Sequence, residues 1–164
     1  MGIEIERKFT IKLMPSDLES YDKHVISQAY LCNDPTVRIR RQDDVYYMTY
    51  KKKGLLSHEE YNLDLTKEGY EHLLTKADGN VLSKTRYLIP LTNPHFKEGY
   101  IAPSDLALVI ELDVFDPPFA PLIMAEIEFP SVECAEAYIP EAWFEEDVTD
   151  DRRYYNSYMV YSSI

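Results

Sequence analysis

Alternation between apolar and polar residues runs through most of this chain and predicts a β-rich fold. Successive side chains of a strand point to opposite faces, so residues two apart share one face. By this criterion we expect strands over 3–9, 24–32, 36–41, 45–53, 59–64, 80–90, 106–115 and 122–129. Between the strands expected over 80–90 and 106–115, residues 91–105 are expected to form a long loop. Such loops are often functional or mobile.

Two short helices are expected between the strands. Ser16 can cap the first, with Glu19 three residues later completing a capping box, and this helix would end near Tyr21. Thr66 can cap the second helix, which is expected over 67–76. Both helices connect strands, so they are expected to lie on the periphery of the sheet.

The C-terminal part predicts two more helices, one after Ser131 and a final one from about Asp151. In the final helix four large residues recur at helical spacing, a stripe that is more typical of packing than of chemistry: Tyr154, Tyr155, Tyr158 and Met159.

The order of elements is β-α-β-β-β followed by the same order again, with the halves beginning near Ile3 and Glu59. Antiparallel strands with no evident edge close most naturally into a barrel. We therefore expect one α+β domain over residues 1–164. Its core would be an eight-stranded antiparallel closed β-barrel, or tunnel, built from a duplicated β-α-β-β-β unit with peripheral helices and a C-terminal helix.

The 164-residue chain carries a formal net charge of −12. So acidic a chain lacks the broad basic surface that nucleic acids and anionic membranes attract, and neither is expected as a partner. Its two cysteines, Cys32 and Cys134, have no metal-type spacing, and no leader or long apolar span is visible. We therefore expect a cytoplasmic protein. The sequence leaves its oligomeric state open, a homodimer included.

Charged residues of one sign recur two positions apart in strand after strand. The first strand places Glu4, Glu6 and Lys8 on one face. Later strands carry Arg38 and Arg40, Lys51 and Lys53, Lys84 and Arg86, Glu111 and Asp113, and Glu126 and Glu128, while Glu60 has Asn62 beside it. A sheet with one solvated face is the alternative, but it predicts mixed signs along each strand. The sign-sorted pairs favour a closed barrel with a charged lumen.

Such a lumen predicts ligands of both signs. Two like charges about 5 Å apart repel by roughly 3 kcal/mol at an effective dielectric constant near 20. Clustered carboxylates suit hard divalent cations such as Mg²⁺ or Mn²⁺, and clustered Arg and Lys suit phosphate oxygens. The pattern therefore indicates a metal-bound chain of several phosphates inside the barrel.

The ordered set of motifs resembles the CYTH domain, or triphosphate tunnel metalloenzyme family. The likeness starts at Glu4-x-Glu6-x-Lys8 and continues through Arg38-x-Arg40, Lys51, Glu60, Lys84-x-Arg86, Glu111-x-Asp113 and Ala125-Glu126-Ile127-Glu128. It extends to residues 147–156, which are similar to the E-V-T-x-D-x-R-Y-x-N pattern of small bacterial members. Essentially the whole chain is covered, and the resemblance implies a tunnel that binds triphosphates and divalent metal.

The resemblance also implies a role for each motif residue. Metal ions, Mg²⁺ or Mn²⁺, would be held by Glu4, Glu6, Glu60, Glu111, Asp113, Glu126 and Glu128. The triphosphate would be bound by Lys8, Arg38, Arg40, Lys51, Lys84 and Arg86. The catalytic set would be Glu4, Glu6, Lys8 and Glu128.

The first functional hypothesis is a divalent-metal-dependent triphosphatase that acts on inorganic tripolyphosphate. The alternatives are a class IV-type adenylate cyclase acting on ATP, a thiamine triphosphatase, and a non-catalytic polyphosphate- or nucleotide-binding protein. All these ligands present the same phosphate tail, so the sequence does not rank them. Asn62 stands where relatives often carry a second acid, which indicates weaker metal binding by that strand.

Overall fold

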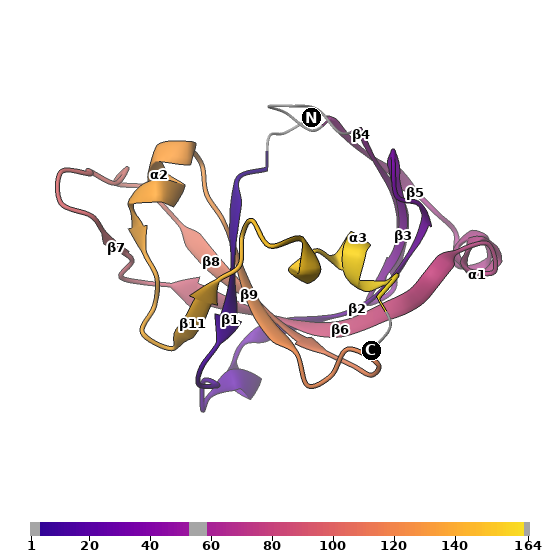
Figure 1. The fold of residues 1–164 in the computed structure, drawn as a ribbon, viewed down its shortest axis with the longest axis horizontal. Coiled ribbons are helices and arrows are strands. Elements are labelled where there is room, and N and C mark those ends of the chain that lie inside the picture. Colours follow the sequence, from indigo (N-terminus) through magenta and orange to yellow (C-terminus); the bar gives the residue numbers. More distant parts are fainter. Residues whose placement is uncertain (1–3, 53–58, 163–164) are drawn as a thin grey trace.

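One curved antiparallel sheet dominates the computed structural model, which describes residues 4–52 and 59–162 (Figure 1). Within these residues every predicted strand is present, as β1 (Glu6–Ile11), β2 (Asp22–Cys32), β3 (Thr36–Gln42), β4 (Val45–Lys52), β5 (Glu59–Asp64), β6 (Asp78–Leu91), β8 (Leu108–Phe115) and β9 (Ile123–Glu128). The predicted positions Ile3 and Lys53 lie outside the described residues.

Three short strands were not predicted. The strand β7 (His95–Phe96) pairs with β10 (Tyr138–Ile139), and β11 (Phe144–Asp147) pairs with β1. Each is too short to show an alternating pattern. Because β7 lies within the predicted loop 91–105, strand pairing orders part of that loop.

The strand order follows the repeated unit. In the main sheet the order is β11-β1-β9-β8-β6-β2-β3-β4-β5, and every described pairing is antiparallel. The two three-strand meanders, β2-β3-β4 and β6-β8-β9, meet at the β2/β6 pair. The first strand of each half adds to the meander of the other half, β1 beside β9 and β5 beside β4. In the described residues, hydrogen bonding between strands ends at β11 and β5.

The apolar faces of the strands form the outer side of the curve. On one half of the sheet, Leu112 and Ile127 pack against Cys134 of α2 (Val132–Ala137) and the chain that follows it. On the other half, Ile39 packs against Tyr70 of α1 (Lys67–Leu74). The helices therefore cover the outside, as predicted, and leave the charged faces turned inward.

One end of the inner face is apolar, and the C-terminal segment packs there. Figure 1 shows η2 (Arg152–Tyr154) and α3 (Asn156–Met159) within the curve of the sheet. The residues in contact are Tyr30, Leu82, Phe115, Met124, Met159 and Val160. Leu82, Phe115 and Met124 each lie two positions from a charged residue of the same strand face. The inner face thus changes from apolar to charged along the strands.

The cap predicted at Thr66 is confirmed and the one at Ser16 is wrong, while the helix expected after Ser131 also begins with a side-chain cap. The side chains of Thr66 and Ser131 accept backbone N–H bonds at the starts of α1 and α2. The first predicted helix is only a 3₁₀ turn, η1 (Leu18–Ser20), which begins at Asp17 without a side-chain cap. The expected capping residue Glu19 instead accepts hydrogen bonds from Lys23 and Tyr87. No helix among the described residues is long and apolar enough to cross a membrane.

The final helix, expected to run on from Asp151, is divided in two. Tyr155 has an extended backbone, with φ −80° and ψ 129°, and separates η2 from α3. Met159 and Tyr154 pack in the apolar end of the inner face, whereas Tyr158 is half exposed. The break turns Tyr155 out of the expected packing stripe.

Candidate active site

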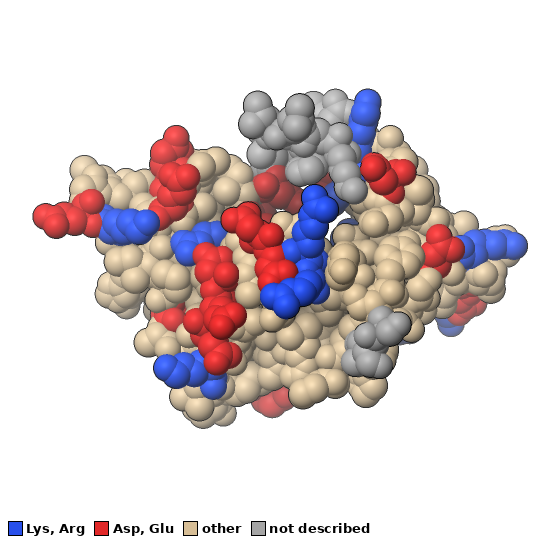
Figure 2. Space-filling model, in the orientation of Figure 1, with Lys and Arg blue, Asp and Glu red and all other residues tan. Residues whose placement is uncertain are grey.

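A cavity of about 900 Å³ lies on the inner side of the sheet. All the predicted site residues line it except Lys84 and Asp113, namely Glu4, Glu6, Lys8, Arg38, Arg40, Lys51, Glu60, Arg86, Glu111, Glu126 and Glu128. Figure 2 shows acidic and basic side chains gathered beside the hollow on the face where the C-terminal segment lies. The sequence therefore brings most of its charged pairs to one place.

Asp113 lies beneath the cavity wall and holds two predicted phosphate-binding bases. It is fully buried and accepts hydrogen bonds from Lys84 Nζ at 2.6 Å and from Arg86 Nε at 2.7 Å. Burial raises the pKa of Asp113, but Lys84 and Arg86 outweigh it and bring the pKa to about 2. Burial also lowers the pKa of Lys84 to about 8, against the effect of Asp113. Neither Asp113 nor Lys84 lines the cavity, and Asp113 orients Arg86, which does.

Arg86 joins this buried pair to the acids of the neighbouring strands. It forms ion pairs with Glu111 and, at 3.1 Å, with Glu126. Burial raises the pKa of Glu126, but Arg86 and Lys84 outweigh it and the pKa falls below its ordinary value. One oxygen of Glu126, Oε1, is buried and accepts no hydrogen bond. The carboxylate thus keeps one oxygen for a ligand.

The first strand meets β9 at the site. Lys8 stands opposite Glu126 in the strand pairing, and Glu6 stands opposite Glu128. The Nζ atom of Lys8 lies 3.6 Å from Glu6 Oε1 and 3.7 Å from Glu126 Oε1. Burial and then the charge of Glu126 raise the pKa of Glu6, and Lys8 offsets this only in part. Like charges on directly opposite residues destabilise a sheet, so this pairing of acids does not stabilise the fold.

Contacts of Lys51, on β4, link the segment just before β1 to β5. Its Nζ lies 3.0 Å from Glu4 Oε2, just before β1, and 3.2 Å from Glu60 Oε2 on β5. Burial lowers the pKa of Lys51, but Glu4 and Glu60 outweigh it and the net shift is upward. Lys51 therefore stays charged at neutral pH.

A further residue of the site comes from the C-terminal segment. The Nζ atom of Lys8 lies 4.9 Å from the ring centroid of Tyr155, a cation–π contact. The hydroxyl of Tyr155 donates to the carbonyl of Thr149, and the Thr149 hydroxyl accepts the backbone N–H of Lys8. The prediction that Tyr155 belongs to a packing stripe is therefore wrong. Helical spacing could not reveal this, because it assumed an unbroken helix.

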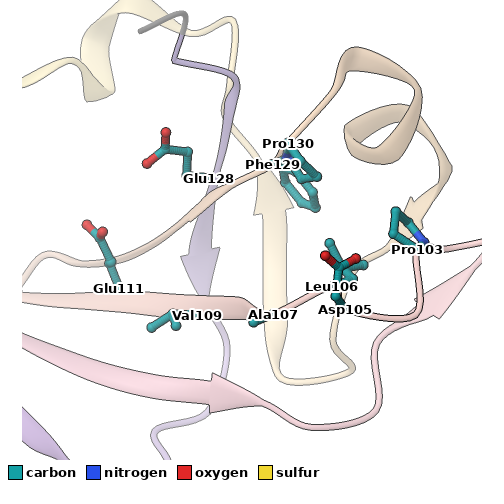
Figure 3. A pocket seen from close by; sticks show the side chains of 9 residues that line it. All are labelled: Pro103, Asp105, Leu106, Ala107, Val109, Glu111, Glu128, Phe129 and Pro130. Atoms are coloured by element: carbon teal, nitrogen blue, oxygen red, sulfur yellow. The ribbon is translucent and has the colours of Figure 1, made fainter. Parts of the chain in front are cut away.

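A second cavity, of about 550 Å³, adjoins the first and shares Glu111 and Glu128 with it. Figure 3 shows these two carboxylates on one side, and Asp105 beside apolar groups such as Leu106 and Pro103 on the other. The remaining lining residues are Pro103, Asp105, Leu106, Ala107, Val109, Phe129 and Pro130. Among the described residues no Lys or Arg lines this cavity, so it does not extend the set of bases predicted to bind phosphate.

Over 165 residues the chain is 36% identical to an inorganic triphosphatase of Nitrosomonas europaea, a match that covers 97% of this chain and 97% of the relative. The chain belongs to the inorganic triphosphatase family. The crystal structure of an inorganic triphosphatase superposes with a TM-score of 0.72 at 32% identity and covers 99% of this chain and 97% of that chain. The resemblance stated from the motifs is confirmed.

A more distant likeness shows the fold alone. A protein of Bacillus halodurans assigned as an adenylate cyclase superposes with a TM-score of 0.54 at 14% identity, over 92% of this chain and 98% of that chain. No family model matches this triphosphatase-family chain.

The carboxylates of this triphosphatase-family chain are spread around the cavity. Among the described residues, no three side chains of His, Cys, Asp or Glu already stand close enough together to hold a metal ion. Several of these carboxylates instead form ion pairs with Arg86 or Lys51. A cation and a phosphate chain would therefore compete with these ion pairs and rearrange them on binding.

Proposed function

We propose that this chain is a divalent-metal-dependent triphosphatase that hydrolyses inorganic tripolyphosphate. The observation that carries the proposal is the convergence of acids and bases from opposite parts of the sheet on one cavity of about 900 Å³. The chain's 36% identity to an inorganic triphosphatase supports it. A ligand that matches such a cavity is a phosphate chain whose charge is shared between cations and Arg or Lys side chains.

The carboxylates fit Mg²⁺ or Mn²⁺. They offer only oxygen ligands, which both ions accept. The buried Oε1 of Glu126 accepts no hydrogen bond, and burial and then the charge of Glu126 raise the pKa of Glu6, so a cation near both carboxylates would relieve their repulsion. Glu6, Glu126 and Glu128 would hold it on the β1/β9 side, with Glu4 and Glu60 on the β5 side. When bound, a divalent cation neutralises charge on phosphate oxygens and lowers the pKa of a coordinated water.

The bases would bind the phosphate chain, and Lys8 would in addition stabilise the transition state. Arg38 and Arg40 line the β3 wall, and a guanidinium can bind two phosphate oxygens at once. Lys8 lies beside Glu6 and Glu126, where the metal-binding acids meet the phosphate-binding bases. Its charge would stabilise the negative charge that develops as the terminal phosphoryl group leaves the diphosphate.

We also propose that the curved sheet closes into the eight-stranded tunnel expected from the sequence, with β1 beside β5. The contact of Lys51 with Glu4 supports this, because it joins the segment just before β1 to β4, the strand that pairs with β5. Closure would exclude bulk water from the cavity and strengthen the ionic contacts with phosphate.

A phosphate-release screen tests the proposed activity. Tripolyphosphate, thiamine triphosphate and ATP would each be incubated with the protein and Mg²⁺, Mn²⁺ or Ca²⁺, and the ATP reactions assayed also for cyclic AMP. We expect metal-dependent orthophosphate release that is fastest with tripolyphosphate. Cyclic AMP as the main product would favour the cyclase instead. Tight binding of all three compounds with no release would show a non-catalytic binding protein.

A further inference from the structure

The arginines of the cavity are held in two different ways. Arg86 pairs with the carboxylates of Asp113, Glu111 and Glu126. Arg38 and Arg40 hydrogen-bond only to uncharged side chains. Within residues 4–52 and 59–162, neither of these two has a carboxylate at ion-pair distance.

Arg40 is fixed by two neutral oxygens. Its Nε donates to Gln28 Oε1 at 2.9 Å, and its Nη1 donates to the Tyr47 hydroxyl at 3.2 Å. Gln28 is fully buried, and its own Nε2 donates to the Tyr30 hydroxyl at 3.3 Å. The amide is thereby fixed with its oxygen toward Arg40.

Arg38 is held by a chain of neutral groups across three strands. Its Nη2 donates to Thr49 Oγ1 at 3.0 Å, and that hydroxyl donates to Asn62 Oδ1 at 2.6 Å. Asn62 Nδ2 in turn donates to Glu60 Oε1 at 3.3 Å. Arg38, Thr49 and Asn62 are direct partners in the strand register. The Nε atom of Arg38 is buried and has no acceptor.

A carboxylate in place of either amide would change the charge of this wall without changing its shape. Glu at position 28 or Asp at position 62 would have nearly the same volume as the native residue. Each would bring a negative charge close to a guanidinium, which a phosphate would then have to displace or share. The native amides orient the two arginines and leave their charges uncompensated, even though burial and Arg40 both disfavour the charged form of Arg38 by lowering its pKa.

We propose that Gln28, Thr49 and Asn62 are positioning residues that hold Arg38 and Arg40 uncompensated, and so determine the affinity of the cavity for a chain of phosphates. The inference rests on the proposed function, because it concerns the arginines of the same site. It also gives Asn62 a role of its own, distinct from that of a lost metal ligand.

Two isosteric variants, Gln28→Glu and Asn62→Asp, test the proposal. The matched control is Asn80→Asp, which makes the same change at an exposed position of β6 outside the cavity. Calorimetric titration with tripolyphosphate in the absence of divalent cations measures binding without requiring hydrolysis. We expect each cavity variant to bind about tenfold more weakly, in line with the loss of a charge-assisted bond, and the control to bind like wild type.

Kinetics and folding complete the test. In phosphate release we expect the KM to rise with little change in kcat, because the arginines bind ground state and transition state alike. Gln28→Glu alters a buried site and could unfold the chain, but Asn62 is exposed and its variant keeps the test decisive. Wild-type affinity in Asn62→Asp would overturn the proposal, as would a tighter Mg²⁺-dependent affinity, which marks a gained metal ligand. A wild-type protein that binds tripolyphosphate without hydrolysing it would refute the proposed function and leave this comparison intact.

Discussion

The Asp113→Asn substitution removes the buried negative charge to which Lys84 and Arg86 are hydrogen-bonded. Asp113 is 0% exposed and accepts bonds from Lys84 Nζ at 2.6 Å and from Arg86 Nε at 2.7 Å and Nη2 at 2.8 Å. Breaking a buried ion pair by removing one partner costs about 3–5 kcal/mol. The drop of the Asp113 pKa from 3.8 to about 2 corresponds to roughly 2 kcal/mol. Both figures indicate a large loss of stability.

The same substitution should change how stability depends on pH. The pKa of Asp113 is lower in the folded chain than its ordinary value of 3.8, so between the two values the unfolded chain binds more protons. The stabilisation is therefore complete above about pH 5 and is lost as the pH falls toward 2. Asp113→Asn should flatten this acid limb of the stability curve.

Thermal unfolding followed by circular dichroism measures the effect. For a chain of this size, a loss of about 3 kcal/mol lowers the Tm by roughly 6–12 °C. In the double variant with Lys84→Met, which removes the cation left unpaired, we expect much of the loss to be recovered. Binding of Mg²⁺ to the folded Asp113→Asn variant should match wild type. If Asp113 were a metal ligand instead, the variant would gain stability from reduced acid crowding and lose Mg²⁺ affinity, and that result would refute the reasoning.

Two other substitutions probe the first strand. Glu6→Gln should abolish phosphate release yet raise the Tm slightly, because burial and Glu126 raise the pKa of Glu6 and its charge costs stability at neutral pH. The expected gain in Tm is small because the side chain is 40% exposed. A fall in Tm would contradict this prediction. Lys8→Ala should weaken tripolyphosphate turnover, while Mg²⁺ binding measured by calorimetry should stay largely intact, since Lys8 competes with a cation for Glu6 and Glu126. A matching loss of Mg²⁺ binding would count against the assignment of Lys8 as a phosphate-binding residue.

The sequence predicted the strands and the charged face because both depend on a local period of two. Alternation tells which face a residue occupies, so Arg40 and Glu126 were correctly placed on the inner side. Alternation does not show how deeply a side chain is buried along that face. Lys84 and Arg86 share a face, but only Arg86 reaches the cavity, because Lys84 is covered by the apolar end of the lumen.

Features that depend on tertiary contacts could not be predicted. The final helix breaks at Tyr155, which contacts Lys8 on a strand 147 residues earlier in the chain. Gln28 carries no charge and so forms no charged pair along β2, although it lies on the inner face and holds Arg40. The capping box expected from Ser16 and Glu19 does not form, because Glu19 accepts hydrogen bonds from Lys23 and Tyr87 instead.

The most direct test of the account compares orthophosphate release from tripolyphosphate by wild type and by Glu128→Gln at saturating Mg²⁺, with folding checked by circular dichroism. Glu128 lines the cavity opposite Glu6 and belongs to the acids that we propose hold the metal. The account predicts steady release by wild type and a loss of at least about a hundredfold in a folded Glu128→Gln variant, comparable to the removal of other groups that act in the transition state. Release by the variant at the wild-type rate would contradict the assignment of the reaction to this cavity.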